Sequence, residues 1–155
     1  MIDYIKNIRA KIGHDTLFLT GCGILLINDD KVLLQLRKDR NQWCIPGGLM
    51  ELGETFFECA IREVFEETGL TVNSAKLFGI YSGKDFFAEY PNGDKIYSPN
   101  IIFISEDFTG DLKSDIVETF EHRFFKKDKI PENIVELQKH WILDWVRGEQ
   151  PVIVK

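Results

Sequence analysis

The stretch Thr55–Gly69 constrains the chain most, because its residues suit a helix with two chemically different sides. Thr55 followed by Glu58 predicts a capping box at the helix start, and Gly69 stands where a C-terminal glycine cap belongs. At about 100° per residue, apolar side chains gather on one half of the helical wheel and charged ones on the other. One side can therefore enter a core, whereas the other is available to bind something else.

Three carboxylates crowd the charged side of this helix. Glu63 and Glu67 lie one turn apart as a like-charge pair that destabilises an isolated helix, and Glu66 adds a third charge. Arg62 can neutralise one of them, through an i,i+4 pair with Glu66 or Glu58, but not all three. A hard divalent cation such as Mg²⁺ would neutralise the rest, since it prefers oxygen ligands and suits carboxylates that face phosphates. A solvated acidic surface is the alternative.

The residues before the helix favour the metal site over the solvated surface. Trp43–Gly48 is a short apolar run that ends in a Pro-Gly-Gly turn. Two consecutive glycines allow close backbone approach and let a carbonyl oxygen point inward. The turn therefore predicts a second wall for a site on the acidic side of the helix.

Residues Gly48–Leu70 resemble the Nudix box at every defining position. A long pattern at fixed spacing is far more specific than a lone glycine motif. The matching positions are Gly48, Glu54, Arg62, Glu63, Glu66, Glu67, Gly69 and the apolar residues Val64 and Leu70, with Pro46-Gly47 as the usual lead-in. The resemblance implies a metal-dependent enzyme that hydrolyses a phosphoanhydride bond in a nucleoside diphosphate linked to another group.

The resemblance also implies roles for single residues. Arg62 would organise the carboxylates, and the general base would be either Glu63 or Glu118, for which a surface carboxylate on a strand is the alternative. The metal, Mg²⁺ or Mn²⁺, would neutralise phosphate charge and lower the pKa of a bound water. Its ligands would be the Gly47 carbonyl, Glu54, Glu63, Glu66 and Glu67.

Three further residues are candidates for substrate contact. Arg37, at a strand end near the turn, could touch a phosphate or form a surface salt bridge, and Trp43 could stack on a base or pack in the core. Gly48 would let the backbone approach the substrate. Several aromatic residues could line a nucleobase or sugar pocket, fill the core or form a dimer surface: Tyr81, Phe86, Phe87, Tyr90 and Tyr97. We expect His122 to be structural.

Elements along the rest of the chain follow from periodicity and turn residues. Isoleucine spacing predicts a short helix over residues 2–12 that packs on the domain, and Asn-Gly within Pro91–Asp94 predicts a hairpin turn. The expected strands are 16–28, 31–37, 75–82, 85–90 and 95–105, and the last helix runs from Pro131 to about Trp145. This order predicts an α/β fold with a mixed β-sheet sandwiched between helices, in agreement with the resemblance.

The length and the net charge of the chain limit the class of protein to which it can belong. A chain of 155 residues predicts one domain, residues 1–155, and the net charge of −6 argues against a basic face for nucleic acid. The cysteines, Cys22, Cys44 and Cys59, lie far apart in apolar surroundings, so we expect buried thiols in a reducing compartment and no zinc site.

Neither a signal peptide nor a spanning segment is visible, because the start is polar and the apolar run Leu17–Ile27 is too short. We therefore expect a cytoplasmic enzyme that acts on a small-molecule nucleotide, with no nucleic acid or membrane partner. A homodimer stays open.

The substrate is not identified by the sequence. Markers that follow the box in family subclasses, such as a proline in ADP-ribose hydrolases, are missing here, where Asp85–Phe87 stands instead. A nucleoside triphosphate pyrophosphohydrolase that cleans the nucleotide pool is one alternative. A catalytically silent module that binds a nucleotide is another, although the complete carboxylate set argues against it.

Overall fold

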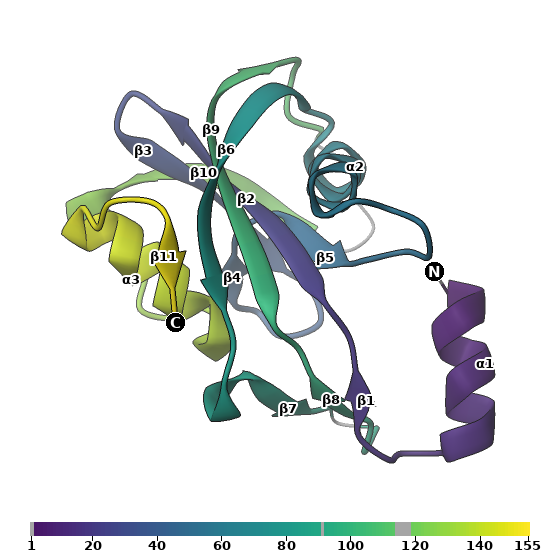
Figure 1. Cartoon of the computed structure of the whole chain (residues 1–155). Helices are drawn as coiled ribbons and strands as arrows, with labels where there is room; N and C mark the ends of the chain where they lie inside the picture. Colours follow the sequence, from purple (N-terminus) through teal and green to yellow (C-terminus); the bar gives the residue numbers. More distant parts are fainter. Residues whose placement is uncertain (1, 91, 114–118) are drawn as a thin grey trace.

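A mixed eight-stranded sheet forms the centre of the protein (Figure 1), and its strands follow the order β10-β3-β2-β9-β6-β11, with β4 paired to β3 and β5 to β2. The computed structural model describes residues 2–90, 92–113 and 119–155. A small second sheet has the order β1-β8-β7. The elements are α1 (Ile2–Ile12), β1 (Leu17–Phe18), β2 (Gly21–Asn28), β3 (Lys31–Arg37), β4 (Trp43–Cys44), β5 (Gly47–Leu49), α2 (Phe56–Thr68), β6 (Thr71–Tyr81), η1 (Lys84–Phe86), β7 (Phe87–Glu89), β8 (Lys95–Tyr97), β9 (Asn100–Thr109), β10 (Thr119–Lys126), η2 (Lys127–Lys129), η3 (Glu136–Gln138), α3 (Lys139–Arg147) and β11 (Ile153–Val154).

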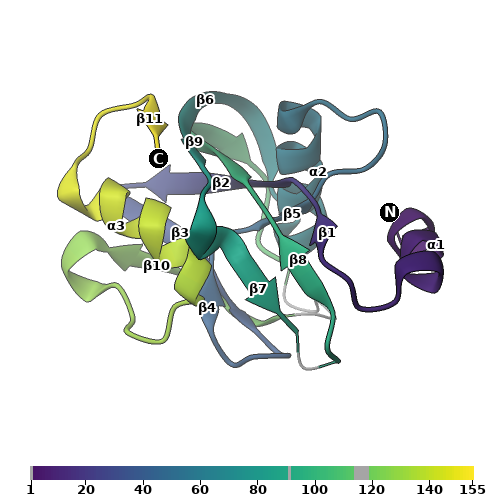
Figure 2. The ribbon, with the colours of Figure 1, turned by 60° about the horizontal axis from the view of Figure 1, so that its bottom comes forward.

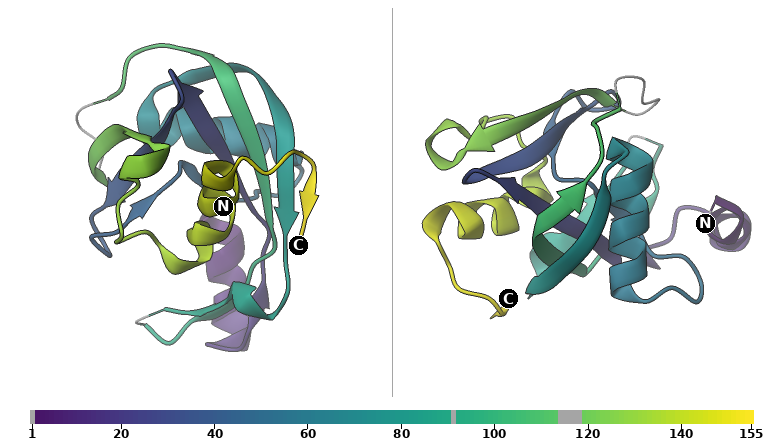
Figure 3. Two further views of the ribbon diagram at one scale, coloured as in Figure 1. Left: turned by 90° about the vertical axis from the view of Figure 1, so that its left-hand side faces the viewer. Right: turned by 90° about the horizontal axis from the view of Figure 1, so that it is seen from above.

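The central strand β2 is buried on both faces, which explains its continuous apolar run. Cys22, Ile24 and Leu26 belong to the core cluster that contains the apolar side of α2. Leu25 and Ile27 belong to the other cluster, which contains the tryptophans of α3. Successive side chains of a strand point to opposite faces, so α2 and α3 cover opposite sides of the sheet, as Figure 3 shows. The expected α/β/α sandwich is confirmed.

Helix α2 begins and ends where the sequence predicts. The Thr55 side chain accepts a hydrogen bond from the Glu58 amide, and the Glu58 carboxylate accepts one from the Thr55 amide, which completes the capping box. Gly69 adopts the left-handed conformation at the C-terminal end, with φ of 80°. Cys59, Ala60 and Val64 are buried on the side of α2 that faces the sheet.

Several elements differ from the expectation. The expected strands 16–28 and 95–105 both divide, since β1 pairs with β8 while β2 pairs with β9. The expected strand 85–90 begins as η1 and is extended only over β7, and the strand expected at 75–82 starts at Thr71. Pro99, which has no amide hydrogen, lies between β8 and β9 and separates the two pairings. The last helix starts at Lys139 and not at Pro131. Residues 133–135 are extended instead, because Trp43 exchanges backbone hydrogen bonds with Asn133 and Val135.

Helix α1 does not pack on the domain as expected. Figure 1 shows it standing to one side of the sheets, and none of the side chains described for residues 4–12 is buried. Its C-terminal end is held by the β7–β8 hairpin, where Arg9 Nη2 donates to the Lys95 carbonyl at 2.7 Å and the His14 ring contacts Asp94 at 2.8 Å. In the described part of the chain, no helix has the length and apolar character needed to span a bilayer.

Candidate active site

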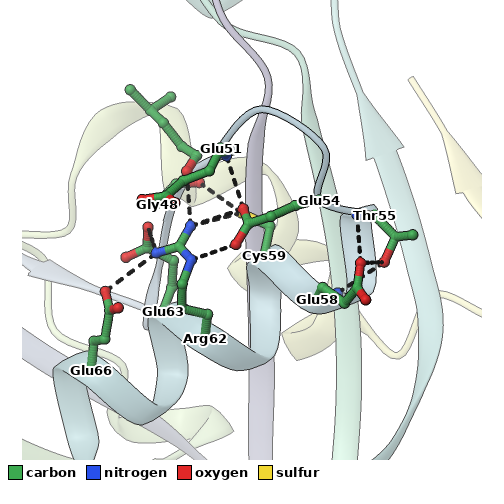
Figure 4. Close-up of polar contacts among 10 residues, drawn as sticks. Gly48, Glu51, Glu54, Thr55, Glu58, Cys59, Arg62, Glu63 and Glu66 are labelled. Atoms are coloured by element: carbon green, nitrogen blue, oxygen red, sulfur yellow. Dashed lines mark hydrogen bonds and ion pairs between the residues drawn. The ribbon is translucent and has the colours of Figure 1, made fainter. Parts of the chain in front are cut away.

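Arg62 binds three carboxylates on the polar side of α2 (Figure 4). Its Nε donates to Glu54 Oε1 at 2.6 Å, and its Nη1 donates to Glu63 Oε1 at 2.8 Å and to Glu66 Oε2 at 3.2 Å. Its Nη2 donates to the Leu49 carbonyl at 3.2 Å, which ties the helix to the glycine turn. The guanidinium lowers the pKa of Glu54 to about 2. Arg62 therefore holds three carboxylates together beside the glycine turn.

Glu67 is the carboxylate that Arg62 does not reach. It is 8% exposed, and its Oε2 accepts a hydrogen bond from the Gly47 amide at 2.8 Å. Burial raises the pKa of Glu67 to about 8, against the opposing effect of the Gly47 hydrogen bond. Among the described residues, no ion pair supplies it with a cation. Glu67 is thus a buried acid without a direct ion-pair partner among the described residues, and Arg37 only partly offsets the effect of burial on its pKa.

The two glycines of the turn make room for the helix and for the neighbouring strand. A Cβ atom on Gly48 would overlap the carboxyl group of Glu63, and one on Gly47 would overlap the carbonyl oxygen of Cys22. Burial also raises the pKa of Glu63, although Arg62 opposes the rise. The close approach predicted from Pro-Gly-Gly is therefore a contact between β5 and the acidic side of α2.

These residues fit a divalent cation by charge and by donor type. Glu54, Glu63, Glu66 and Glu67 bring four carboxylates to one place, and Arg62 supplies one positive charge. All the donors are oxygen atoms, as Mg²⁺ and Mn²⁺ prefer. Across the described ranges no three such side chains already stand at metal-binding geometry. Because Arg62 holds three of them, a metal would have to draw Glu63 and Glu66 away from the guanidinium.

A pocket of about 290 Å³ adjoins the same turn and contains both Gly47 and Gly48 in its wall. Arg37 and Arg40 also line it, and both contact Asp39, with Arg37 Nε at 2.8 Å from Oδ1. The other lining residues are Gly21, Cys22, Gly23, Ile45, Leu49, Ala88, Tyr90, Ile96, Ser98, Asn100, Ile102, Val135, Leu137, Gln138 and Trp141. Figure 2 shows this end of the molecule, where β7 and β8 lie in front of β2 and β5. The pocket brings cationic side chains close to the carboxylate cluster.

The structure places the other residues that the sequence proposes for substrate contact in different surroundings. Arg37 and Gly48 line the pocket, whereas Trp43 is 7% exposed and packs edge-on against Phe125 with ring centroids 4.8 Å apart. Trp43 is therefore a core residue, and the interpretation as a stacking platform is not supported. Glu118 lies outside the described residues. Of the aromatic set, Tyr90 lines the pocket, Tyr81 and Phe86 are buried, and Phe87 is exposed.

Sequence reasoning missed one buried polar residue behind the site, Gln35. Gln35 is fully buried on β3, opposite Cys44 and His122. Its amide lies beside Glu67 and opposes the rise in that pKa, although neither amide atom makes a hydrogen bond of good geometry within the described residues. Nε2 of His122 is likewise buried without a partner there. The signal in the sequence is a glutamine inside the apolar run Val32–Leu36.

Comparison with known proteins agrees with the fold and the box. The sequence model of the NUDIX domain matches residues 18–145. The chain is 34% identical over 126 residues to an ADP-ribose pyrophosphatase of Methanocaldococcus jannaschii, covering 79% of this chain and 70% of that protein. It is 28% identical over 139 residues to a putative 8-oxo-dGTP diphosphatase of Bacillus subtilis, covering 89% and 87%. A MutT protein structure from Bacillus halodurans superposes with a TM-score of 0.71 at 26% identity, covering 87% of this chain and 86% of the other.

Proposed function

The chain belongs to the NUDIX family and is a pyrophosphohydrolase, and we propose that its substrate is a nucleoside diphosphate linked to a second group. The family generally uses divalent metal ions, and we propose Mg²⁺ or Mn²⁺ for this chain. Glu54, Glu63, Glu66 and Glu67 would hold the metal, together with the carbonyl of Gly47.

The observation that carries the proposal is the shared position of turn, carboxylates and pocket. Gly47 and Gly48 contact Glu67 and Glu63 on one side and line the pocket on the other. A substrate whose diphosphate crosses this turn would have its nucleoside in the pocket and its scissile bond beside the cluster. Arg37, at the pocket wall, would bind a phosphate oxygen.

The roles that we propose for single residues follow from their contacts. When bound, the metal would neutralise phosphate charge and lower the pKa of a bound water. Arg62 would position Glu54, Glu63 and Glu66, and burial of Glu67 would strengthen its attraction to a cation. Glu63 is the candidate general base within the described residues, and Glu118 stays the alternative from the sequence.

Two relatives favour different substrates. The name of the archaeal relative, ADP-ribose pyrophosphatase, supports a diphosphate linked to a sugar. The name of the bacterial relative, putative 8-oxo-dGTP diphosphatase, supports a nucleoside triphosphate as the second candidate. The 34% identity of the former against 28% for the latter is why we place the linked diphosphate first.

A turnover panel tests the proposal. The purified chain is incubated with ADP-ribose, nucleotide sugars, dinucleotides and nucleoside triphosphates, with Mg²⁺, Mn²⁺ or a chelator, and products are separated by chromatography. We expect metal-dependent cleavage of a linked diphosphate to give a nucleoside monophosphate. Faster release of pyrophosphate from triphosphates would select the second candidate, and tight nucleotide binding without turnover would favour the silent module.

A further inference from the structure

A buried glutamine beside the carboxylate cluster has polar atoms that its surroundings do not satisfy. Gln35 is fully buried, and within the described residues neither its Oε1 nor its Nε2 makes a hydrogen bond of good geometry. Burial of an amide without a partner destabilises a fold, so each such group in a native protein needs an explanation. An apolar side chain of similar length would suit a core better, and packing alone therefore does not explain a glutamine here.

The alternation of β3 places Gln35 on the face of the sheet that α2 covers. Leu33 belongs to the core cluster that contains the apolar side of α2, whereas Leu34 belongs to the cluster on the opposite face. Side chains two residues apart along a strand share a face. Gln35 therefore lies on the same face as Leu33 and extends towards α2, the helix that carries the glutamates of the site.

Glu67 is the carboxylate of α2 that this amide adjoins. The Gln35 side chain is close enough to oppose the rise that burial causes in the pKa of Glu67. Oε2 of Glu67 accepts a hydrogen bond from the Gly47 amide at 2.8 Å, and in the described part of the chain no hydrogen bond reaches its Oε1. The backbone of Gln35 is paired with that of Cys44, shortly before Gly47 in the chain. The amide of Gln35 and the glycine turn thus approach Glu67 from adjoining segments.

We propose that Gln35 is a positioning residue for Glu67, and that its Nε2 donates a hydrogen bond to Oε1 of the carboxylate when Glu67 binds a divalent cation. This inference rests on the metal site proposed above. Gln35 and Gly47 would then hold one oxygen each, which fixes the plane of the carboxylate and the direction of its remaining lone pairs. The same bond would supply the missing partner of the buried amide. Loss of a residue that orients a metal ligand typically lowers metal affinity or activity by about 10- to 100-fold.

Replacement of Gln35 by methionine separates positioning from packing. Q35M keeps the length of the side chain and removes the donor, whereas L33M alters a fully buried residue on the same face of the same strand and is the control. Without metal, Q35M should have a urea midpoint equal to or above that of the wild type, because it removes a buried amide without a partner. Its affinity for Mn²⁺, measured by isothermal titration, should fall by about 10-fold or more. L33M should bind Mn²⁺ as the wild type does.

Nuclear magnetic resonance of the wild type detects the proposed hydrogen bond without any variant. One side-chain amide proton of Gln35 should move downfield as Mg²⁺ is added, because it becomes hydrogen-bonded to a carboxylate. An unmoved signal at saturating Mg²⁺, or Mn²⁺ affinity in Q35M equal to that of the wild type, would overturn the role of Gln35 and leave the metal site intact. Loss of affinity together with a lower urea midpoint in Q35M would make the role structural and also overturn it. A wild type that binds neither ion would reject the metal site itself, and the role of Gln35 with it.

Discussion

Helix α2 buries Cys59, Ala60 and Val64 against the sheet of its own chain, whereas no described side chain of α1 is buried. Both helices have apolar residues at helical spacing, and both have charged residues on the other side. The difference lies in their surroundings, because α2 meets an apolar sheet face on one side and the glycine turn on the other. Amphipathic spacing therefore predicts a helix and its apolar side, but not the surface that covers it.

The largest effect on turnover is expected from a substitution of Glu67, on the polar side of α2. E67Q should lower metal-dependent turnover by about 100-fold or more, because it removes the buried charge next to the turn. The ordinary pKa of 4.5 is raised to about 8 in the fold, so Glu67 costs stability as the pH rises from 4.5 through 8. Without metal at pH 8, E67Q should therefore melt at or above the temperature of the wild type.

The matched control for E67Q is E58Q, which changes an exposed glutamate on the same helix, outside the box. It should keep near-normal turnover. If E67Q also kept near-normal turnover at saturating Mg²⁺, Glu67 would not be a metal ligand.

Removal of the guanidinium should have the next largest effect. R62A frees Glu54, Glu63 and Glu66 from their common partner, and residues that orient metal ligands typically change affinity or activity by about 10- to 100-fold. R62K should recover little, since an ammonium cannot reproduce the planar fork. Isothermal titration with Mn²⁺ and turnover measure the two losses. Unchanged metal affinity in R62A would show that the carboxylates need no organiser.

The apolar sides of the two helices can be compared directly by truncation. V64A removes two methyl groups from a fully buried side chain and should lower the free energy of unfolding by about 2 kcal/mol. I8A in α1, where Ile8 is only partly buried, should change it by less than about 0.5 kcal/mol. Urea denaturation measures both. Equal losses would mean that α1 is packed on its own chain after all.

The smallest expected effect is a loss of stability at acidic pH. Arg62 lowers the pKa of Glu54 from 4.5 to about 2, so the ionised carboxylate contributes stability above pH 4.5 that is lost as the pH falls towards 2. The urea midpoint of the wild type should fall more steeply over this interval than that of E54Q. Parallel curves would indicate that the Glu54–Arg62 pair does not stabilise the fold, as is common for ion pairs that water reaches.

Part of the site could be predicted because its residues are close in the sequence. Arg62 and the glutamates of α2 share one helix, so helical periodicity alone places them together, and Glu54 follows from the box spacing. Gln35 could not be found in this way, since it reaches Glu67 only through the pairing of β3 with β4 and β10. The same holds for the pocket, whose wall combines Arg37 with Tyr90 and Asn100 from distant strands.

The sequence by itself determined the two ends of α2, its acidic and apolar sides, the glycine turn and the resemblance that places the chain in its family. These depend on local geometry, namely the helical period, the capping residues and the conformational freedom of glycine. Only the tertiary structure decided that Trp43 packs in the core, that the last helix starts at Lys139 and that α1 stands apart. Each of these depends on which strands compete for the same backbone or surface, and that competition is settled by contacts between residues far apart in the chain.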